Sequence, residues 1–334
     1  MPRIVSSPPE VLTSAQYFDA PRRFPEFAWI VLAYTVALIL EGAFVRATGS
    51  GAGCGNHWPL CGGQLVFGTP ALATVIEFAH RSMTVIDTVL ILWLVVWAFR
   101  AFPKHHGVRL AAALSTLFLL TEALIGAALV KYGLVVNDAS PARAAVLSLH
   151  QTNTLTLLAC LTLTAWWAGH VRFRPSGRTA WMAWGSLSAV AVLAITGVLA
   201  ALADTLYPVH SLAAGFAQDL SPDANFAVRL RAMHPFLAAA VAFWLVYYAL
   251  RRAANARKPA LAVIAIAAAQ LLAGALNLLL LAPIWMQMVH LLLADLLWIA
   301  LVVLCVHSTE DSTQRSMQPS GWPGVRRQSG GGGF

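Results

Sequence analysis

Eight apolar runs, each long enough to cross a lipid bilayer, constrain the fold of this 334-residue chain more than any other feature. A membrane-spanning helix needs about 20 consecutive, mostly apolar residues. Charged residues make up only 11% of the chain, against about 25% in an ordinary soluble domain. The sequence therefore predicts an all-α membrane protein with eight transmembrane helices. The runs lie at 26–46, 71–99, 108–130, 144–168, 180–203, 226–250, 259–281 and 284–307.

The positions of the basic residues predict how these helices are oriented. Arginine and lysine gather before the first run, after the eighth, and between runs two and three, four and five, and six and seven. Loops rich in these residues stay on the cytoplasmic side of a membrane. We therefore expect a multi-pass protein of the plasma (inner) membrane with both termini in the cytoplasm. The net charge of +8 then reflects topology, and it indicates no nucleic-acid partner.

The chain contains an internal repeat. The first span carries "EGAFVRATGS" (41–50) where the fifth carries "TGVLAALADT" (196–205). The third carries "EALIGAAL" (122–129) where the seventh carries "QLLAGALN" (270–277). Each half has four spans, an even number, so the two halves share one orientation and are related by an axis along the membrane normal.

The repeat predicts a tandem arrangement of two pseudo-symmetric four-helix bundles. The N-terminal half covers residues 26–168 and the C-terminal half covers residues 180–307. A cytoplasmic linker (169–179) joins them. A cytoplasmic N-terminal tail (1–25) and a flexible C-terminal tail (308–334) flank the two halves.

Four of the ten histidines stand inside predicted spans, one in each even-numbered span. Each lies about 7 to 10 residues into its span, so all four imidazoles lie roughly 10–15 Å below the outer surface. Ionisable groups at this depth are costly and usually functional. A hydrogen bond to a neighbouring helix explains one such residue, but it does not explain four at one depth. The four are His80, His150, His234 and His290.

Two imidazoles facing each other across a four-helix bundle suit a haem iron, which takes two axial ligands. Zinc would need a third or fourth ligand, whereas each half offers two histidines, and Cys160 and Cys305 lie deeper as core residues. We therefore expect one bis-histidine haem site in each half. Candidate partners for the haem propionates are Arg81, Arg229 and Arg231, which equally suit the role of interfacial arginines.

The halves differ beside these histidines. Glu77 stands one helical turn before His80 and on the same face, whereas Arg231 occupies the matching place before His234. A poorly solvated carboxylate at a haem edge is suited to chemistry. The asymmetry predicts that the first half carries out the reaction and that the second holds a permanent haem. The alternative for Glu77 is a structural hydrogen bond or an ion pair with Arg81.

A second acidic residue in the first half also has a neutral counterpart. Glu122 falls where the repeat has Gln270. We interpret both side chains as structural polar contacts.

Five motifs, taken in order, resemble the haem A synthases of bacteria and mitochondria. They are "GAFVRATGSGAGCGNHWPLCGG", "IEFAHR", "LSLHQTNT", "DTLYPVHSL…RLRAMHP" and "QMVHLLLAD", within about residues 25–307. These enzymes oxidise the C8 ring methyl of haem O to a formyl group, which makes haem A for terminal oxidases. The resemblance implies a resident haem b bound by His234 and His290. It also implies that substrate haem O faces His80 and His150, with Glu77 as the essential acidic residue.

The resemblance also bears on partners. It indicates an oxidoreductase of haem biosynthesis that serves cytochrome c oxidase assembly. The protohaem farnesyltransferase that makes haem O and the oxidase assembly factors are candidate partners, together with the lipid membrane. Some family members carry a second cysteine pair between spans five and six, but residues 204–225 have none. The electron acceptor, the oxygen source and the oligomeric state stay open.

The motif "CGNHWPLC" (54–61) holds two of the four cysteines. On the predicted topology it lies between the first two spans on the outer, oxidising side, where disulfides persist. A zinc clamp is disfavoured because six residues separate the cysteines and no second pair exists. We expect a Cys54–Cys61 disulfide that stiffens a lid over the first-half haem pocket. Whether it also exchanges electrons stays open.

Two other classes of protein fit parts of the pattern. A non-catalytic dihaem cytochrome that relays electrons explains the four histidines equally well, but it explains neither Glu77 nor the family-like outer loop. A transporter suits the repeat, yet transporters usually rely on broken helices at the midplane, and no pair of spans shows such interruptions. The residues alone leave cytochrome and enzyme evenly matched, and the resemblance favours the enzyme.

Overall fold

The computed structural model describes residues 23–55, 57, 60–62, 70–170 and 177–307, and nine helices make up the regular structure of these residues. The N-terminal tail up to residue 22, the C-terminal tail (308–334) and linker residues 171–176 lie outside the described residues. Eight of the nine helices are long and apolar enough to cross a membrane. The expected all-α membrane architecture is confirmed.

These eight helices correspond to the eight predicted spans, and their ends differ from the predicted ends by no more than three residues. Local signals support the agreement: Pro141 opens the fourth span, and the Ser140 hydroxyl accepts a hydrogen bond from the Arg143 backbone N–H at 3.2 Å. The helices are α1 (Arg23–Ala47), α2 (Leu72–Ala101), α3 (Gly107–Lys131), α4 (Pro141–Trp167), α5 (Gly177–Leu206), α7 (Phe226–Arg252), α8 (Arg257–Leu279) and α9 (Ile284–Val306).

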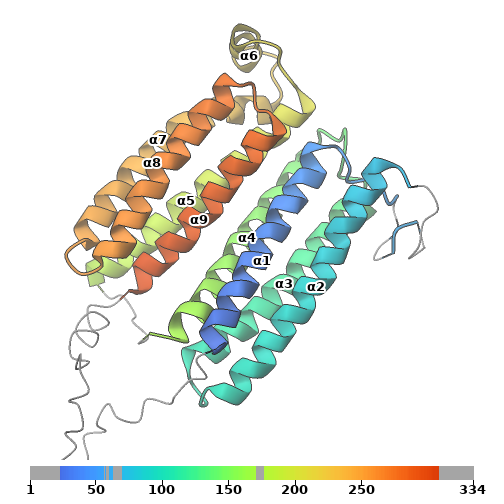
Figure 1. The fold of residues 1–334 in the computed structure, drawn as a ribbon. Coiled ribbons are helices and arrows are strands. Elements are labelled where there is room, and N and C mark those ends of the chain that lie inside the picture. The colour runs from blue at the N-terminus through green and yellow to red at the C-terminus, as the bar shows by residue number, and fades with distance from the viewer. Residues whose placement is uncertain (1–22, 56, 58–59, 63–69, 171–176, 308–334) are drawn as a thin grey trace, which may run out of the picture.

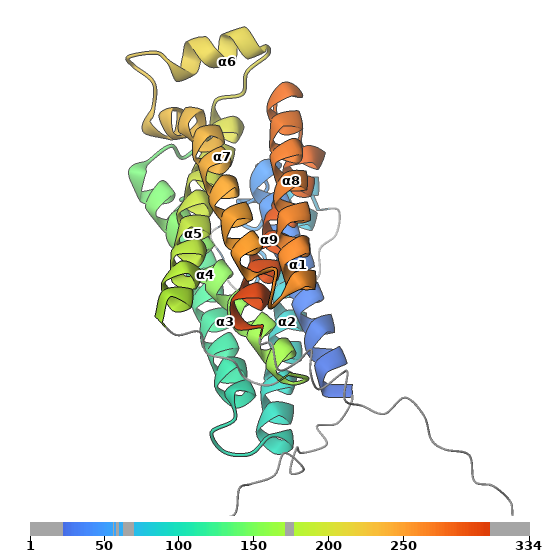
Figure 2. The same ribbon diagram turned by 90° about the vertical axis from the view of Figure 1, so that its left-hand side faces the viewer.

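The short helix α6 (Leu212–Asp219) departs from the prediction, which treats residues 204–225 as a loop. Ser211 caps it, because the Ser211 hydroxyl accepts a hydrogen bond from the Ala214 backbone N–H at 3.1 Å. None of its residues is buried, and at eight residues it is too short for a hydrophobic pattern to distinguish it from a loop. It lies beyond the ends of α5 and α7 (Figure 2), and we call this end of the molecule the α6 end.

The long helices form two neighbouring groups of four, α1–α4 and α5 with α7–α9 (Figure 1). The groups meet where α9 contacts α1 and α4, and where α5 contacts α4. The Trp298 indole N–H of α9 donates a hydrogen bond to the Leu155 carbonyl of α4 at 2.8 Å. This arrangement is consistent with two tandem bundles.

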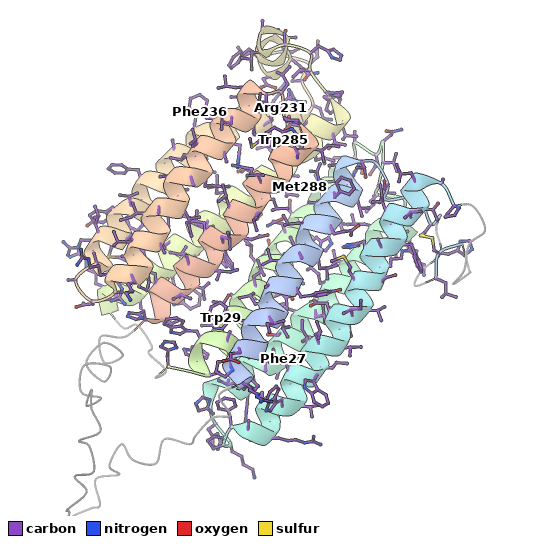
Figure 3. The ribbon with its side chains drawn as sticks, in the orientation of Figure 1. Phe27, Trp29, Arg231, Phe236, Trp285 and Met288 are labelled. Atoms are coloured by element: carbon purple, nitrogen blue, oxygen red, sulfur yellow. A yellow bond between two sulfur atoms is a disulfide. The ribbon has the colours of Figure 1, made fainter. Side chains whose placement is uncertain are left out.

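The apolar core fills the half of the helices away from the α6 end. Its fully buried members include Phe24 and Val31 near the start of α1, Leu94 near the end of α2, and Leu304 near the end of α9. Large apolar side chains such as Phe236 and Trp285 (Figure 3) are exposed on the outer surface, as expected where lipid surrounds a helix bundle. The other half of the helices, toward the α6 end, contains a large cavity beside two small buried clusters, around Leu202 and around Val228.

Candidate functional site

A cavity of about 1460 Å³ lies between the apolar core and the α6 end. It exceeds the about 300–1,000 Å³ of an ordinary small-molecule pocket. Side chains from both groups of helices line it, so the cavity is continuous across the two halves. The structure brings the four predicted histidines together on its walls: His80, His150, His234 and His290.

Each of these histidines packs against a glycine on another long helix of the same half. We describe the closeness by the distance from a Cβ atom, placed on the glycine, to the nearest atom of the imidazole. In three pairs this distance is shorter than an ordinary van der Waals contact. Only a residue without a Cβ atom therefore allows the imidazole ring to pack so closely against the neighbouring helix. The pairs are Gly42 with His80 (2.8 Å), Gly274 with His290 (3.0 Å), Gly197 with His234 (3.1 Å) and Gly126 with His150 (3.8 Å).

The two histidines of the first half also lie against carboxylates. A Glu41 oxygen lies 2.7 Å from Nδ1 of His80, and a Glu122 oxygen lies 2.9 Å from Nδ1 of His150. The interpretation of Glu122 as a polar contact is therefore confirmed, and the contact is with a histidine. Sequence reasoning missed Glu41. The signal was its place directly before Gly42, where the second half has Thr196 before Gly197.

The two histidines of the second half lie against neutral groups. The Thr196 hydroxyl is 2.9 Å from Nδ1 of His234, and the Gln270 amide nitrogen is 3.3 Å from Nε2 of His290. The polar contact expected of Gln270 is thus present, and its partner is again a histidine.

The donor set fits a haem iron in each half. Two imidazoles per half would supply two nitrogen ligands to such an iron. Contacts at Nδ1 of His80, His150 and His234 leave Nε2 of these rings as the ligand atom. At His290 the Gln270 amide lies at Nε2, so that contact would give way to the iron. Within the described ranges, no three His, Cys, Asp or Glu side chains come together around a common point. Paired imidazoles on a large apolar cavity therefore suit a macrocycle-bound iron better than a bare ion.

Glu77 lies on the wall of the same cavity and is only 3% exposed. One of its carboxylate oxygens pairs with the Arg81 guanidinium at 2.5 Å. The other accepts a hydrogen bond from the Cys54 backbone N–H at 2.8 Å. Glu77 therefore forms the ion pair with Arg81 that the sequence left as an alternative, and it also lines the cavity.

The Cys54–Cys61 disulfide is present, and its loop is fastened to the start of α2. The Arg81 guanidinium donates to the carbonyls of His57 at 2.7 Å and Leu60 at 3.0 Å. A Cβ on Gly53 would lie 2.3 Å from the Ala73 carbonyl oxygen, so only glycine permits this close approach. Glu77 and Arg81 thus hold the disulfide loop beside His80.

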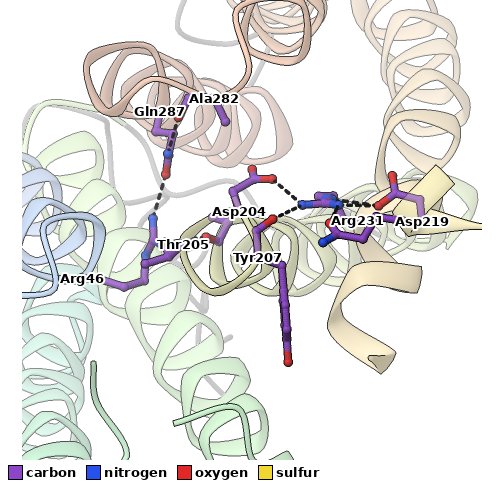
Figure 4. Close-up of polar contacts among 10 residues, drawn as sticks. Arg46, Asp204, Thr205, Tyr207, Asp219, Arg231, Ala282 and Gln287 are labelled. Atoms are coloured by element: carbon purple, nitrogen blue, oxygen red, sulfur yellow. Dashed lines mark hydrogen bonds and ion pairs between the residues drawn. The ribbon is translucent and has the colours of Figure 1, made fainter. Parts of the chain in front are cut away.

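Arg231 fastens the corresponding connection of the second half (Figure 4). Its guanidinium pairs with Asp219 of α6 at 2.5 Å and with Asp204 of α5 at 3.3 Å. Arg229 lies apart from the cavity lining and donates to the carbonyls of Pro222 and Ala224. Of the three arginines proposed as propionate partners, the structure therefore places Arg81 and Arg231 at the cavity, but not Arg229.

A further arginine, missed at the sequence level, joins the two halves. Arg46 of α1 donates to the Ala201 carbonyl at 2.8 Å and to the Thr205 hydroxyl at 2.6 Å, both on α5. It also donates to the Gln287 side-chain oxygen of α9 at 3.0 Å. Arg46 lines the cavity, so it places a cation where the two halves meet.

Comparison with known proteins agrees with this site. The sequence model of the COX15-CtaA family, described as cytochrome oxidase assembly protein, matches residues 25–302. The chain belongs to the haem A synthase family. The heme A synthase of Lysinibacillus sphaericus is 41% identical over 31% of this chain and 35% of its own length. That of an Exiguobacterium species is 34% identical over 41% of this chain and 43% of its own length.

A longer relative covers almost the whole chain. A protein of Thermus thermophilus named protoheme IX farnesyltransferase is 41% identical over 92% of this chain and 52% of its own length. The chain thus spans about half the length of that relative.

Proposed function

We propose that this protein oxidises the C8 ring methyl of haem O to a formyl group and so produces haem A. The observation that carries the proposal is one cavity, lined by two histidine pairs at repeat-equivalent positions, in a chain of the haem A synthase family. In the proposal, haem O lies between His80 and His150 of the first half. His234 and His290 hold a resident haem b, which supplies one-electron redox chemistry when bound.

Glu77 is the residue of the chain that we assign to the chemical step. It lies on the cavity wall one turn before His80, held from both sides by Arg81 and the Cys54 N–H. A carboxylate fixed in this way can accept a proton from the reacting methyl group or stabilise positive charge that develops on the methyl carbon. The second half has Arg231 at this position in place of an acid. That half therefore lacks the carboxylate that we assign to the reaction, as expected of a half that only holds a cofactor.

The proposal places the α6 end on the outer side of the membrane. The disulfide loop then lies in the oxidising compartment. The α2–α3 and α7–α8 connections lie at the opposite end and carry positive charge, as cytoplasmic loops do. Their basic residues are Arg100, Lys104, Arg251, Arg252, Arg257 and Lys258.

We also propose that the farnesyltransferase that makes haem O acts next to this protein. The support is the longer Thermus relative, which carries that name and of which this chain matches about half. Co-purification of a tagged chain with the farnesyltransferase from a membrane extract tests the association.

Co-expression with a supply of haem O, followed by haem extraction and mass analysis, tests the proposed reaction. The expected product is haem A, found only when the chain is present. If the purified protein holds haem B alone and turns over no haem O, the chain is a dihaem cytochrome and the proposed function is wrong.

Gly42→Ala is expected to weaken haem binding in the first half. The added methyl group would lie 2.8 Å from Cε1 of His80 and would displace the ring. Overpacking of this kind costs about 1–3 kcal/mol, which corresponds to about 5- to 150-fold weaker binding. Haem titration followed by absorbance measures the change. Gly185→Ala on α5 is the matched control, because its nearest neighbour lies at 4.0 Å and it is not part of the cavity wall. Equal affinities in the two variants would contradict the packing argument.

A further inference from the structure

We propose that Glu41 and Glu122 are positioning residues that make the first-half histidines stronger iron ligands than those of the second half. The inference rests on the proposed function, in which each half binds a haem. It assigns a lower reduction potential to iron held by His80 and His150 than to iron held by His234 and His290.

The first step in the argument is the matched geometry of the two carboxylates. Each places an oxygen within 2.9 Å of Nδ1 of a histidine, at 2.7 Å for Glu41 and 2.9 Å for Glu122. Their side chains are only 17% and 18% exposed, so water screens their charge weakly. Both negative charges therefore act on the imidazoles at close range.

Glu122 is also held in place by its own partners. The Asn153 amide donates to one of its oxygens, and the Thr154 hydroxyl donates to the other. Asn153 is in turn bonded to Thr121 and to the Phe118 carbonyl of α3. These contacts fix the carboxylate against His150 independently of any bound ligand.

The second step is the replacement of both acids at the equivalent positions of the second half. Glu41 precedes Gly42 as Thr196 precedes Gly197, and Glu122 precedes Gly126 by four residues as Gln270 precedes Gly274. Thr196 contacts Nδ1 of His234, as Glu41 contacts Nδ1 of His80, whereas Gln270 contacts Nε2 of His290. The repeat thus keeps a polar partner for every histidine, but only the first half makes that partner anionic.

The third step is the chemistry of an outer partner. A carboxylate at the far nitrogen of a ligating imidazole makes the ligand more basic. A more basic and more negative environment stabilises ferric iron relative to ferrous iron, which carries less positive charge. With haem bound, this difference would make iron held by His80 and His150 the electron donor and iron held by His234 and His290 the acceptor.

Exchange of residues between the repeats tests the inference. Glu122→Gln gives the first half the neutral residue that the second half has naturally, and Thr196→Glu places an acid at Nδ1 of His234, where the first half has Glu41 at Nδ1 of His80. Midpoint potentials of the purified, haem-loaded full chain are measured by redox titration followed by absorbance, and low-spin ferric EPR signals are recorded. Each midpoint is assigned to a half with His150→Ala and His290→Ala, which each remove one ligand.

We expect Glu122→Gln to raise the first-half midpoint and leave the second unchanged. At a fixed potential, the ferric-to-ferrous ratio of the first half should fall about tenfold. Thr196→Glu should lower the second-half midpoint, and it decides the question if Glu122→Gln no longer binds haem. Two bound haems with unchanged midpoints in Thr196→Glu overturn the inference alone. A wild-type chain that binds no haem in the first half overturns the proposed function, and the inference with it.

Discussion

Glu77→Gln is expected to retain both haems and to lose formyl product. The amide keeps the volume of the side chain and can still accept the hydrogen bond from the Cys54 N–H, but it removes the negative charge that faces Arg81 and the cavity. Loss of a preorganised electrostatic contact of this kind lowers turnover by about 10²- to 10³-fold. Mass analysis of extracted haem after co-expression with a haem O supply measures the product, and absorbance measures the haem content.

The control for this variant must separate the charge of Glu77 from its hold on the disulfide loop. Thr74→Val serves this purpose, because the Thr74 hydroxyl donates to the Gly53 carbonyl at 2.7 Å and carries no charge. We expect Thr74→Val to retain most of the product. Undiminished product in Glu77→Gln would refute the assignment. Equal losses in the two variants would show that Glu77 acts through the loop.

Arg46→Met is expected to cause a large loss of stability. The variant leaves the Ala201 carbonyl and the Gln287 oxygen without their cationic donor at the junction of the two halves. Hydrogen bonds to charged groups contribute about 1.5–3 kcal/mol each, so the loss should be about 3 kcal/mol or more. Thermal unfolding of the detergent-solubilised protein measures it. Arg257→Met, at an exposed position on α8, is the matched control and should change stability by less than about 0.5 kcal/mol. Equal effects would mean that Arg46 does not hold the halves together.

Much of the fold could be predicted from the sequence because length and hydropathy determine membrane helices almost completely. The eight spans follow directly from that rule. Helix α6 could not be predicted in the same way. Its eight residues bury no side chain, and it is held by Ser211 and by the contacts of Asp219 with Arg231, a residue on another helix.

Part of the candidate site could be predicted from the sequence, because a histidine within an apolar span is conspicuous. The repeat then pairs His80 with His234 and His150 with His290. The partners of these histidines are harder to find, because contacts between helices depend on how the helices are rotated and shifted against one another. Glu41 stands near the end of a span, where an acid is unremarkable. Arg46 looks like an interfacial residue until α5 and α9 are placed beside it.

The division of the molecule into a packed half and a hollow half has a thermodynamic consequence. The apolar side chains that line the cavity have no packing partners on the cavity side, whereas those of the opposite half are packed on all sides. A ligand that fills the cavity supplies those contacts, and by mass action it stabilises the folded chain in proportion to the logarithm of its free concentration. Unfolding of the ligand-free chain should therefore begin at the α6 end. With haem as that ligand, as proposed, the amount of folded protein in a membrane would depend on how much haem the cell makes.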